Sequence, residues 1–249
     1  MKRWDGLRSR FDIEWRHFHV KPSKPGSGKS SQSGPARNRN AAASRLGQHK
    51  SVSGWPGGVK RSADVLVSVA ALVVLAPLLI LIAATVSLAD RGPILYRQKR
   101  IGLGGRRFTI IKFRTMREDA ERDLGAIWSV PDDPRCTRIG HYLRRFGLDE
   151  LPQLWNILRG EMSLIGPRPE RPEFTREFRR EHSQYDLRHT VRPGLSGYAQ
   201  AYGWRGQTSL EERLLHDLYY VKNWSLGLDV YIFFLTLVRG WSERTRNGV

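Results

Sequence analysis

Residues 65–89 form a run of 25 residues without a charged side chain. As a helix rising about 1.5 Å per residue, such a run can cross a hydrocarbon core of roughly 30 Å, and no other segment of the chain is long enough to do so. About 60 polar and basic residues precede it, far more than the n-region of a signal peptide contains. We therefore expect a retained membrane anchor within residues 60–91.

Pro77 stands in the middle of this run, where its ring and missing N–H kink a helix and leave about twelve residues on each side. Cations flank both ends, with Lys60 and Arg61 before the run and Arg91 and Arg97 after it, whereas a single span favours cations on one side. Both observations favour a reentrant helix hairpin, broken at Pro77, that enters and leaves by the cytoplasmic face. An ordinary kinked span stays open, because membrane helices tolerate proline.

Residues 1–59 hold 12 Lys and Arg against 3 Asp and Glu, among many Ser, Gly, Pro and Asn. A disordered basic tail is expected, because few of these residues could form a core. The segment Trp4–Val20 mixes apolar side chains with cations, which leaves an interfacial helix open as an alternative. The whole chain carries 42 Lys and Arg against 24 Asp and Glu, so its partners are expected to be nucleic acid, acidic lipids or phosphorylated substrates.

Residues 92–249 predict a mixed, helix-rich α/β domain. Two apolar or β-branched runs, 94–96 and 108–113, flank a glycine turn and are typical of strands. Helical patterns follow at 117–125, 152–159, 171–181 and 210–222. Residues 226–241 are apolar but too short to span a membrane, which favours an interfacial amphipathic helix or one packed beneath the anchor.

The densest cluster of chemically active side chains lies at residues 144–156. Pro152 belongs in the first turn of a helix, which places Asp149 and Glu150 at a helix N-terminus where backbone N–H groups converge. Simple capping of that helix is the alternative. Residues 135–171 also contain seven arginines, which favour a site for a phosphorylated substrate and a divalent cation. In this stretch Pro167 and Pro169 flank Arg168 and would present its guanidinium rigidly.

No competing catalytic pattern is found. The glycines at 102–105 lack the spacing of a dinucleotide or phosphate-binding loop, and the histidines are scattered. Cys136 is the only cysteine, which excludes an internal disulfide and a cysteine-based zinc site.

At these residues the chain resembles the bacterial sugar transferase family, the monotopic phosphoglycosyl transferases. The resemblance runs in order from residue 60 to residue 240 and is carried by the following stretches: Lys60-Arg61-x-x-Asp64, Tyr96-Arg97-Gln98-x-Arg100-Ile101-Gly102, Lys112-Phe113-Arg114-Thr115-Met116, Asp132-Asp133-Pro134-Arg135, Leu148-Asp149-Glu150-Leu151-Pro152-Gln153-Leu154, Met162-Ser163-Leu164-Ile165-Gly166-Pro167-Arg168-Pro169, Arg192-Pro193-Gly194 and Tyr219-Tyr220-Val221-Lys222-Asn223-Trp224-Ser225.

The resemblance implies a set of site residues. Asp149 would be the nucleophile, Glu150 would bind Mg²⁺, and Pro77 would break the membrane hairpin. Contacts to phosphate and nucleotide are implied at Arg144, Pro167, Arg168 and Arg205, with Lys112 and Asp217 in support. Residues 203–208 look like the branch that transfers glucose-1-phosphate, and galactose-1-phosphate transferases are close relatives. The chain departs from the family's usual hydroxyl residues at Ala76 and Gly147, and from its usual Val-Asn-Gly at 201–203.

The implied reaction moves a hexose-1-phosphate from a UDP-sugar to polyprenyl phosphate, releases UMP and starts exopolysaccharide or capsule synthesis through an aspartyl phosphosugar. The implied partners are the UDP-sugar, polyprenyl phosphate and anionic lipids, without nucleic acid, and a homodimer is left open. The expected location is the bacterial inner membrane, with residues 92–249 on the cytoplasmic face. The rival hypothesis is a membrane-tethered binder of polyanions that uses the basic tail, but it leaves the Asp149–Glu150 pair unexplained.

Overall fold

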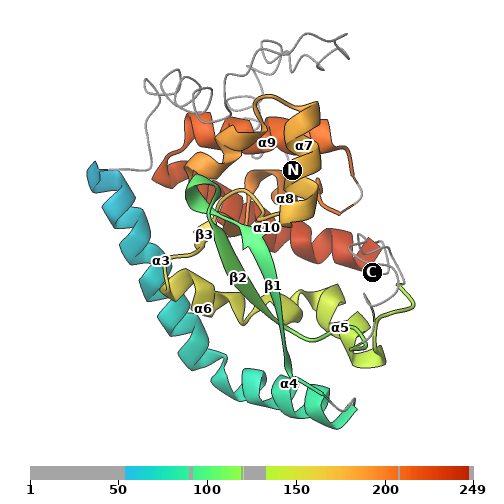
Figure 1. Ribbon diagram of the computed structural model, residues 1–249. Coiled ribbons are helices and arrows are strands. Elements are labelled where there is room, and N and C mark those ends of the chain that lie inside the picture. The colour runs from blue at the N-terminus through green and yellow to red at the C-terminus, as the bar shows by residue number, and fades with distance from the viewer. Residues whose placement is uncertain (1–53, 90–91, 119, 121–132, 207, 247–249) are drawn as a thin grey trace.

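The computed structural model describes residues 54–89, 92–118, 120, 133–206 and 208–246, with side chains as far as residue 239 (Figure 1). Most of the predicted tail and most of the predicted helix 117–125 lie outside these ranges. The elements, labelled as in Figure 1 with η for 3₁₀ helices, follow in the order α3 (Gly54–Val74), α4 (Ala76–Ala89), β1 (Leu95–Ile101), η2 (Leu103–Gly105), β2 (Arg107–Phe113), α5 (Arg138–Phe146), η3 (Leu148–Glu150), α6 (Gln153–Leu158), β3 (Ser163–Ile165), α7 (Pro172–Glu181), η4 (Tyr185–Thr190), β4 (Gly194–Ser196), α8 (Tyr198–Ala201), α9 (Leu210–Asn223) and α10 (Leu226–Arg246).

The prediction of a mixed, helix-rich α/β fold is confirmed. β1 and β2 form an antiparallel hairpin whose register pairs Leu95 with Phe113 and Ile101 with Arg107. β3 and β4 form a second, parallel pair of three residues each. The sequence predicted the hairpin but not β3, β4 or α5. β3 and β4 were missed because three-residue strands are too short to show a periodicity.

The uncharged run forms two helices that meet at an angle. α3 and α4 are bent by 64° relative to each other, and only as a pair do they have the length and apolarity of a membrane segment; among the described residues no single helix does. The break falls at Leu75 rather than at Pro77 itself, which lies in the first turn of α4. This position follows from proline chemistry, since Pro77 has no N–H to donate to the carbonyl of Val73 one turn earlier.

α3 has its polar side inside and its apolar side outside. The residues that it buries are Lys60, Asp64 and Ser68, spaced one turn apart. Large apolar side chains are exposed on the rest of the helix: Leu66, Val67, Val69, Val73 and Val74. A water-soluble helix has the opposite pattern, so this outer surface is suited to an apolar environment.

Both halves of the bent pair are attached to the same α/β domain. Arg61 of α3 donates hydrogen bonds to the carbonyls of Ile157 (2.6 Å) and Leu158 (2.9 Å), at the end of α6. The Asp64 carboxylate accepts the N–H of Leu164, the middle residue of β3, at 3.0 Å. At the far end, Ile82 and Val86 of α4 pack in one hydrophobic cluster with Phe113 of β2 and Leu143 of α5.

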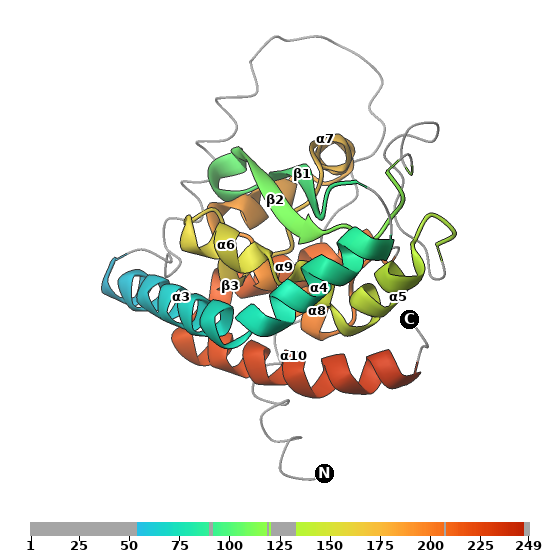
Figure 2. The ribbon, with the colours of Figure 1, turned by 90° about the horizontal axis from the view of Figure 1, so that it is seen from below.

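Helix α10 is joined to α3 through a buried carboxylate. Asp229 accepts hydrogen bonds from Lys60 (2.7 Å), Tyr220 (2.8 Å) and Trp224 (3.1 Å). Figure 2 shows α10 along one side of the molecule, α7 on the opposite side, and the bent pair crossing in front. α10 buries Leu228 and Ile232 but exposes Val230, Phe233, Phe234, Leu237 and Val238, so its outer face is apolar as well.

Candidate active site

The corner between α5 and α6 carries Asp149 and Glu150. Gly147 ends α5 in the left-handed region, with φ of 67°, and its N–H caps the carbonyls of Leu143 and Arg144. A side chain at this position would be strained, so the observed backbone favours glycine here. The two acids follow at once in η3, while α6 begins only at Gln153 and Pro152 lies just before it. The prediction that they occupy a helix N-terminus is therefore wrong in detail, because a separate 3₁₀ turn holds them.

Glu150 is held by two cations from distant parts of the chain. Its Oε1 accepts from Lys112 Nζ of β2 at 2.7 Å and from Arg168 Nη2 at 2.6 Å. Its Oε2 has only a 3.3 Å contact with Arg168 Nη1. Burial would raise the pKa of the Glu150 carboxyl, but the charges and hydrogen bonds of Arg168 and Lys112 outweigh burial and hold this pKa well below its ordinary value. Glu150 is thus a fixed anion, with Oε2 as its less occupied oxygen.

Asp149, its neighbour, has a different environment. It is only 8% exposed, and its carboxylate accepts no hydrogen bond from any residue that the structure describes. Burial raises the pKa of the Asp149 carboxyl, and the charge of Glu150 adds to this effect, while Lys112, Arg144 and Arg168 oppose it. A carboxylate that is desolvated, unbonded and close to three cations has its oxygen lone pairs available for reaction.

Arg144 and Lys112 are positioned by neighbouring backbone and side chains. The Nε of Arg144 donates to Thr115 Oγ1 at 2.8 Å, which links α5 to the segment after β2. Lys112 projects from β2, and β2 is fastened to α6 by the fully buried Asn156, whose side chain accepts from Ile111 N and donates to Thr109 O. The predicted residues Lys112, Arg144, Asp149 and Glu150 therefore meet at one place.

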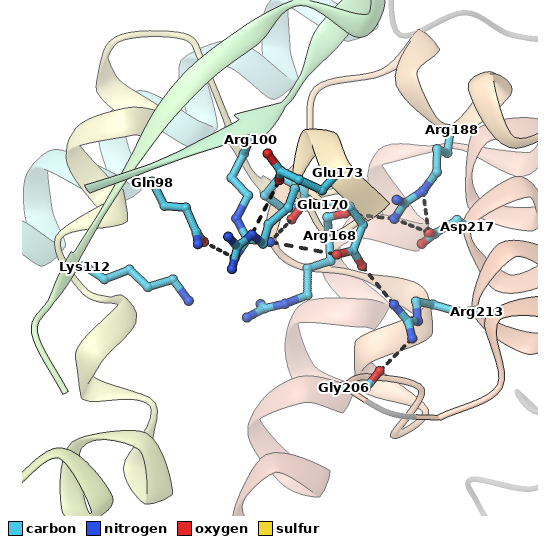
Figure 3. A network of polar contacts seen from close by, with 12 residues as sticks. Gln98, Arg100, Lys112, Arg168, Glu170, Glu173, Arg188, Gly206, Arg213 and Asp217 are labelled. Atoms are coloured by element: carbon cyan, nitrogen blue, oxygen red, sulfur yellow. Dashed lines mark hydrogen bonds and ion pairs between the residues drawn. The ribbon is translucent and has the colours of Figure 1, made fainter. Parts of the chain in front are cut away.

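The loop 166–170 brings Arg168 to the same place, and its backbone is held on several sides. Arg188 donates to the carbonyl of Arg168 at 2.8 Å, and Arg100 donates to that of Pro169 at 3.2 Å (Figure 3). The carbonyl of Pro167 accepts the N–H of Gly194 at 3.0 Å, which accounts for Pro167 as part of the loop's frame.

Glycine is required where this loop crosses β4. A Cβ added to Gly166 would lie 2.3 Å from the carbonyl oxygen of Arg192, and one added to Gly194 would lie 2.1 Å from the N of Gly166. The backbones are therefore in direct contact, and the Arg168 loop has little freedom to move away from β4.

One predicted site residue, Asp217, lies apart from this cluster. Asp217 is 1% exposed, and its Oδ2 accepts from Arg188 Nη2 at 2.6 Å and Nε at 3.0 Å. It therefore contacts Arg188 rather than the Glu150 cluster, and reaches Arg168 only through Arg188. Arg205 is exposed on the loop between α8 and α9.

Sequence reasoning gave no role to Arg188, Arg213 or Asn156, although all three hold the site in place and Asn156 is the last residue of the 144–156 cluster. Arg188 contacts Asp217, a partner 29 residues away, and Asn156 contacts Thr109, a partner 47 residues away. No local pattern indicates such pairs. Asn156 gave one signal, since a polar residue on the buried face of a short helix is expected to bond a neighbouring backbone; Gln153 is the other buried polar residue of α6.

The donor set is compatible with Mg²⁺ only if a substrate completes it. Among the described residues, no group of three or more His, Cys, Asp or Glu side chains could hold a metal ion. Mg²⁺ is commonly bound by one or two carboxylates together with substrate phosphates, rather than by an all-protein cage. Glu150, with its less occupied Oε2, and the adjacent Asp149 fit this mode.

Comparisons with known proteins find one family and several of its named relatives. The model of the family described as bacterial sugar transferase matches residues 55–243. The UDP-glucose:undecaprenyl-phosphate glucose-1-phosphate transferase of Klebsiella pneumoniae is 40% identical over 190 residues, which cover 75% of this chain and 41% of the relative. The UDP-N-acetylgalactosamine-undecaprenyl-phosphate N-acetylgalactosaminephosphotransferase of Aeromonas hydrophila is 44% identical over 181 residues, which cover 72% and 43%. The exopolysaccharide production protein PSS of Rhizobium leguminosarum bv. phaseoli is 42% identical over 195 residues, which cover 76% and 96%. The chain thus spans less than half the length of the first two relatives and nearly all of the third.

Proposed function

The chain belongs to the bacterial sugar transferase family, and from that premise we propose that it transfers a hexose-1-phosphate from a UDP-sugar to polyprenyl phosphate and releases UMP. One observation carries the proposal: two adjacent carboxylates are kept in opposite conditions. Glu150 is fixed by Lys112 and Arg168, whereas Asp149 is buried and accepts no hydrogen bond from the described residues. This difference suits two separate roles: Asp149 is available as a nucleophile, while Glu150 remains a fixed anion beside it.

In the first step an Asp149 oxygen attacks the phosphorus that bears the sugar. A bond forms between the carboxylate and that phosphorus, the bond to the bridging oxygen of the diphosphate breaks, and UMP leaves with the electron pair. No general base is needed, because an ionised carboxylate carries no proton to remove. Lys112, Arg144 and Arg168 supply the positive charge that offsets repulsion between the carboxylate and the diphosphate.

In the second step an oxygen of polyprenyl phosphate attacks the same phosphorus. The bond to Asp149 breaks, the carboxylate is regenerated, and the product is polyprenyl diphosphate-sugar. Arg168 and Lys112 serve both steps, since each step passes negative charge through the same phosphoryl oxygens. Glu150 keeps both cations in place and would hold Mg²⁺ through Oε2. When bound, Mg²⁺ would neutralise charge on the phosphate oxygens.

The bent pair supports the proposed membrane arrangement. The uncharged part of α3 after Asp64 has ten residues and α4 has 14, so the two arms reach about 15 Å and about 21 Å against a hydrocarbon core of roughly 30 Å. Neither arm alone crosses the core, and both pack on one α/β domain. These facts support a reentrant anchor on the cytoplasmic face of the inner membrane, with the apolar face of α10 in the interface and anionic lipids meeting the chain's excess of cations.

Glucose is the proposed sugar, with galactose next. The support is the resemblance of residues 203–208 to the glucose branch and the name of the Klebsiella relative. The Aeromonas relative is named for N-acetylgalactosamine, so that sugar belongs in any test. The name of the Rhizobium relative supports a role in exopolysaccharide production.

The test is UMP release from a panel of UDP-sugars in detergent with polyprenyl phosphate. UDP-glucose should give the highest kcat/KM, and Asp149→Asn should lower turnover by several orders of magnitude, because it removes the charge and the nucleophile but keeps the shape. Asp186→Asn serves as the control, since Asp186 pairs with Arg179 and His189 on α7 and η4 and contacts none of the site residues. If wild-type protein released no UMP from any UDP-sugar, the proposed function would be wrong.

A further inference from the structure

Arg213, in the first turn of α9, connects two loops that are far apart in the sequence. Its Nη1 donates to Glu170 Oε1 at 2.9 Å. Its Nη2 donates to the carbonyl of Gly206 at 2.7 Å and to that of Thr208 at 3.3 Å. The residue is 3% exposed, so this guanidinium bridges the loops from within the protein (Figure 3).

The Glu170 end of this bridge belongs to the Arg168 loop. Glu170 follows Arg168 by two residues, and its backbone carbonyl accepts the N–H of Ile101 at 3.0 Å. Its carboxylate also lies 3.8 Å from Arg100, whose guanidinium donates to the carbonyl of Pro169. Glu170 therefore links the Arg213 side chain to the loop that carries Arg168.

The other end belongs to the loop between α8 and α9. Gly203 and Gly206 have positive φ values of 85° and 63°, so the backbone turns sharply on both sides of Trp204 and Arg205. The N–H groups of Gly203, Trp204 and Arg205 bond to nearby carbonyls, but the carbonyls of Gly206 and Thr208 are held by the Arg213 side chain. Arg213 thus fixes the backbone of this loop at Gly206 and Thr208.

We propose that Arg213 is a positioning residue that holds the Trp204–Gly206 turn at a fixed distance from Arg168, so that both sides of the UDP-sugar site are formed before substrate arrives. The inference rests on the proposed function, in which Arg168 binds the diphosphate, and on the nucleotide contact that the family resemblance implies at Arg205 in this turn. A turn that is already ordered costs no loop entropy on binding, so loss of the bridge weakens substrate binding. The chemical step at Asp149 does not use this bridge and keeps its rate.

The test compares Arg213→Lys with wild type and with Asp186→Asn, all as full chains in detergent. Lysine keeps a cation beside Glu170 but cannot bond Glu170 and two loop carbonyls together, because it lacks the planar fork of arginine. The KM for the UDP-sugar should rise about tenfold, equivalent to about 1.4 kcal/mol, while kcat changes by less than threefold. Asp186→Asn should leave both constants unchanged.

A second measurement reports the turn directly. Trypsin can cleave after the exposed Arg205, and the peptide that ends there can be followed by mass spectrometry. Cleavage should be several-fold faster in Arg213→Lys and in Arg213→Gln than in wild type, and saturating UDP-sugar should slow it. Because the cleavage rate does not depend on turnover, this measurement can also be made on a variant that has little activity.

Two results would overturn the inference while wild type still releases UMP: an unchanged KM with unchanged cleavage after Arg205 in Arg213→Lys, or an equal loss of kcat and kcat/KM with KM unaltered. Absence of UMP release from wild type with every UDP-sugar would instead reject the proposed function.

Discussion

Arg188 and Asp217 form an ion pair from which water is excluded, and removal of the arginine gives a sharp stability prediction. Both side chains are 2% exposed, and the guanidinium donates to Asp217 Oδ2 at 2.6 and 3.0 Å. Breaking such a pair by removing one partner costs about 3–5 kcal/mol, because the other charge stays buried without compensation. At about 2–4 °C per kcal/mol for a domain of this size, Arg188→Met should lower Tm by about 6–20 °C.

The pH dependence of this variant is the opposite of that of an ordinary salt-bridged aspartate. Burial already raises the pKa of Asp217 above its ordinary value, with Arg188 opposing that rise. Without Arg188 the folded-state pKa rises further, so the folded state holds the proton more strongly than the unfolded state does. The stability deficit should therefore grow as pH increases from the unfolded pKa through the folded pKa, and shrink in acid.

Thermal unfolding in detergent, followed by circular dichroism at several pH values, measures both effects. Arg188→Met combined with Asp217→Leu should recover much of the lost Tm, because no charge is left buried. Arg179→Met, which breaks a partly exposed pair with Asp186, is the matched control and should lower Tm only slightly. A Tm loss for Arg188→Met no larger than that of the control would refute the assignment of Asp217 to a structural pair.

Three further predictions concern the site and the membrane. Burial raises the pKa of Asp149, so UMP release should increase with pH through a value above the pKa of a free aspartate. Lys112→Met removes a cation that opposes this rise, so the acid limb of the pH profile should move to still higher pH. An acid limb that does not move would contradict the assignment of this limb to Asp149. Arg168→Lys should reduce kcat/KM for the UDP-sugar by about tenfold to a hundredfold, because it replaces the two-pronged contact with Glu150 by a single donor; steady-state kinetics with equal constants in both proteins would disprove a phosphate-binding role. Gly58→Cys and Pro93→Cys, each with Cys136→Ala, should both be shielded from an impermeant thiol reagent in intact cells, and labelling of only one of them would establish a transmembrane span.

Local chemistry made part of the site predictable from the sequence. Asp149, Glu150 and Arg168 stand in short motifs whose residue types already indicate phosphate chemistry, and the structure brings them together with Lys112 and Arg144. The pairing of Lys112 with Glu150 joins residues 38 positions apart, so only the resemblance suggested Lys112. The resemblance assigned Asp217 to substrate support, and its buried pairing with Arg188 could not be expected, because the two residues lie 29 positions apart.

The fold was predictable to the extent that periodicity extends over many residues. The helices at 171–181 and 210–222 and the strand at 108–113 were expected close to where they occur, as α7, α9 and β2, whereas β1 extends from Leu95 to Ile101, well beyond the strand expected at 94–96. The helix expected at 152–159 occurs as α6, Gln153–Leu158, but Asp149 and Glu150 form their own 3₁₀ turn after Gly147 rather than the N-terminus of that helix. The inward polar stripe of α3, Lys60, Asp64 and Ser68, was not predicted, because the partners of its first two residues, Asp229 and Leu164, depend on tertiary packing.

The covalent role of Asp149 can be measured most directly in the absence of the lipid acceptor. Purified wild-type protein mixed with UDP-glucose labelled in the sugar, but without polyprenyl phosphate, should release about one UMP per active enzyme in a single burst and retain the sugar label on the protein. Addition of polyprenyl phosphate should then discharge the label into the lipid, and Asp149→Asn should show neither burst nor label. Release of UMP only when the lipid is present, with no label on the protein at any time, would mean that the lipid attacks the UDP-sugar directly and that Asp149 is not the nucleophile.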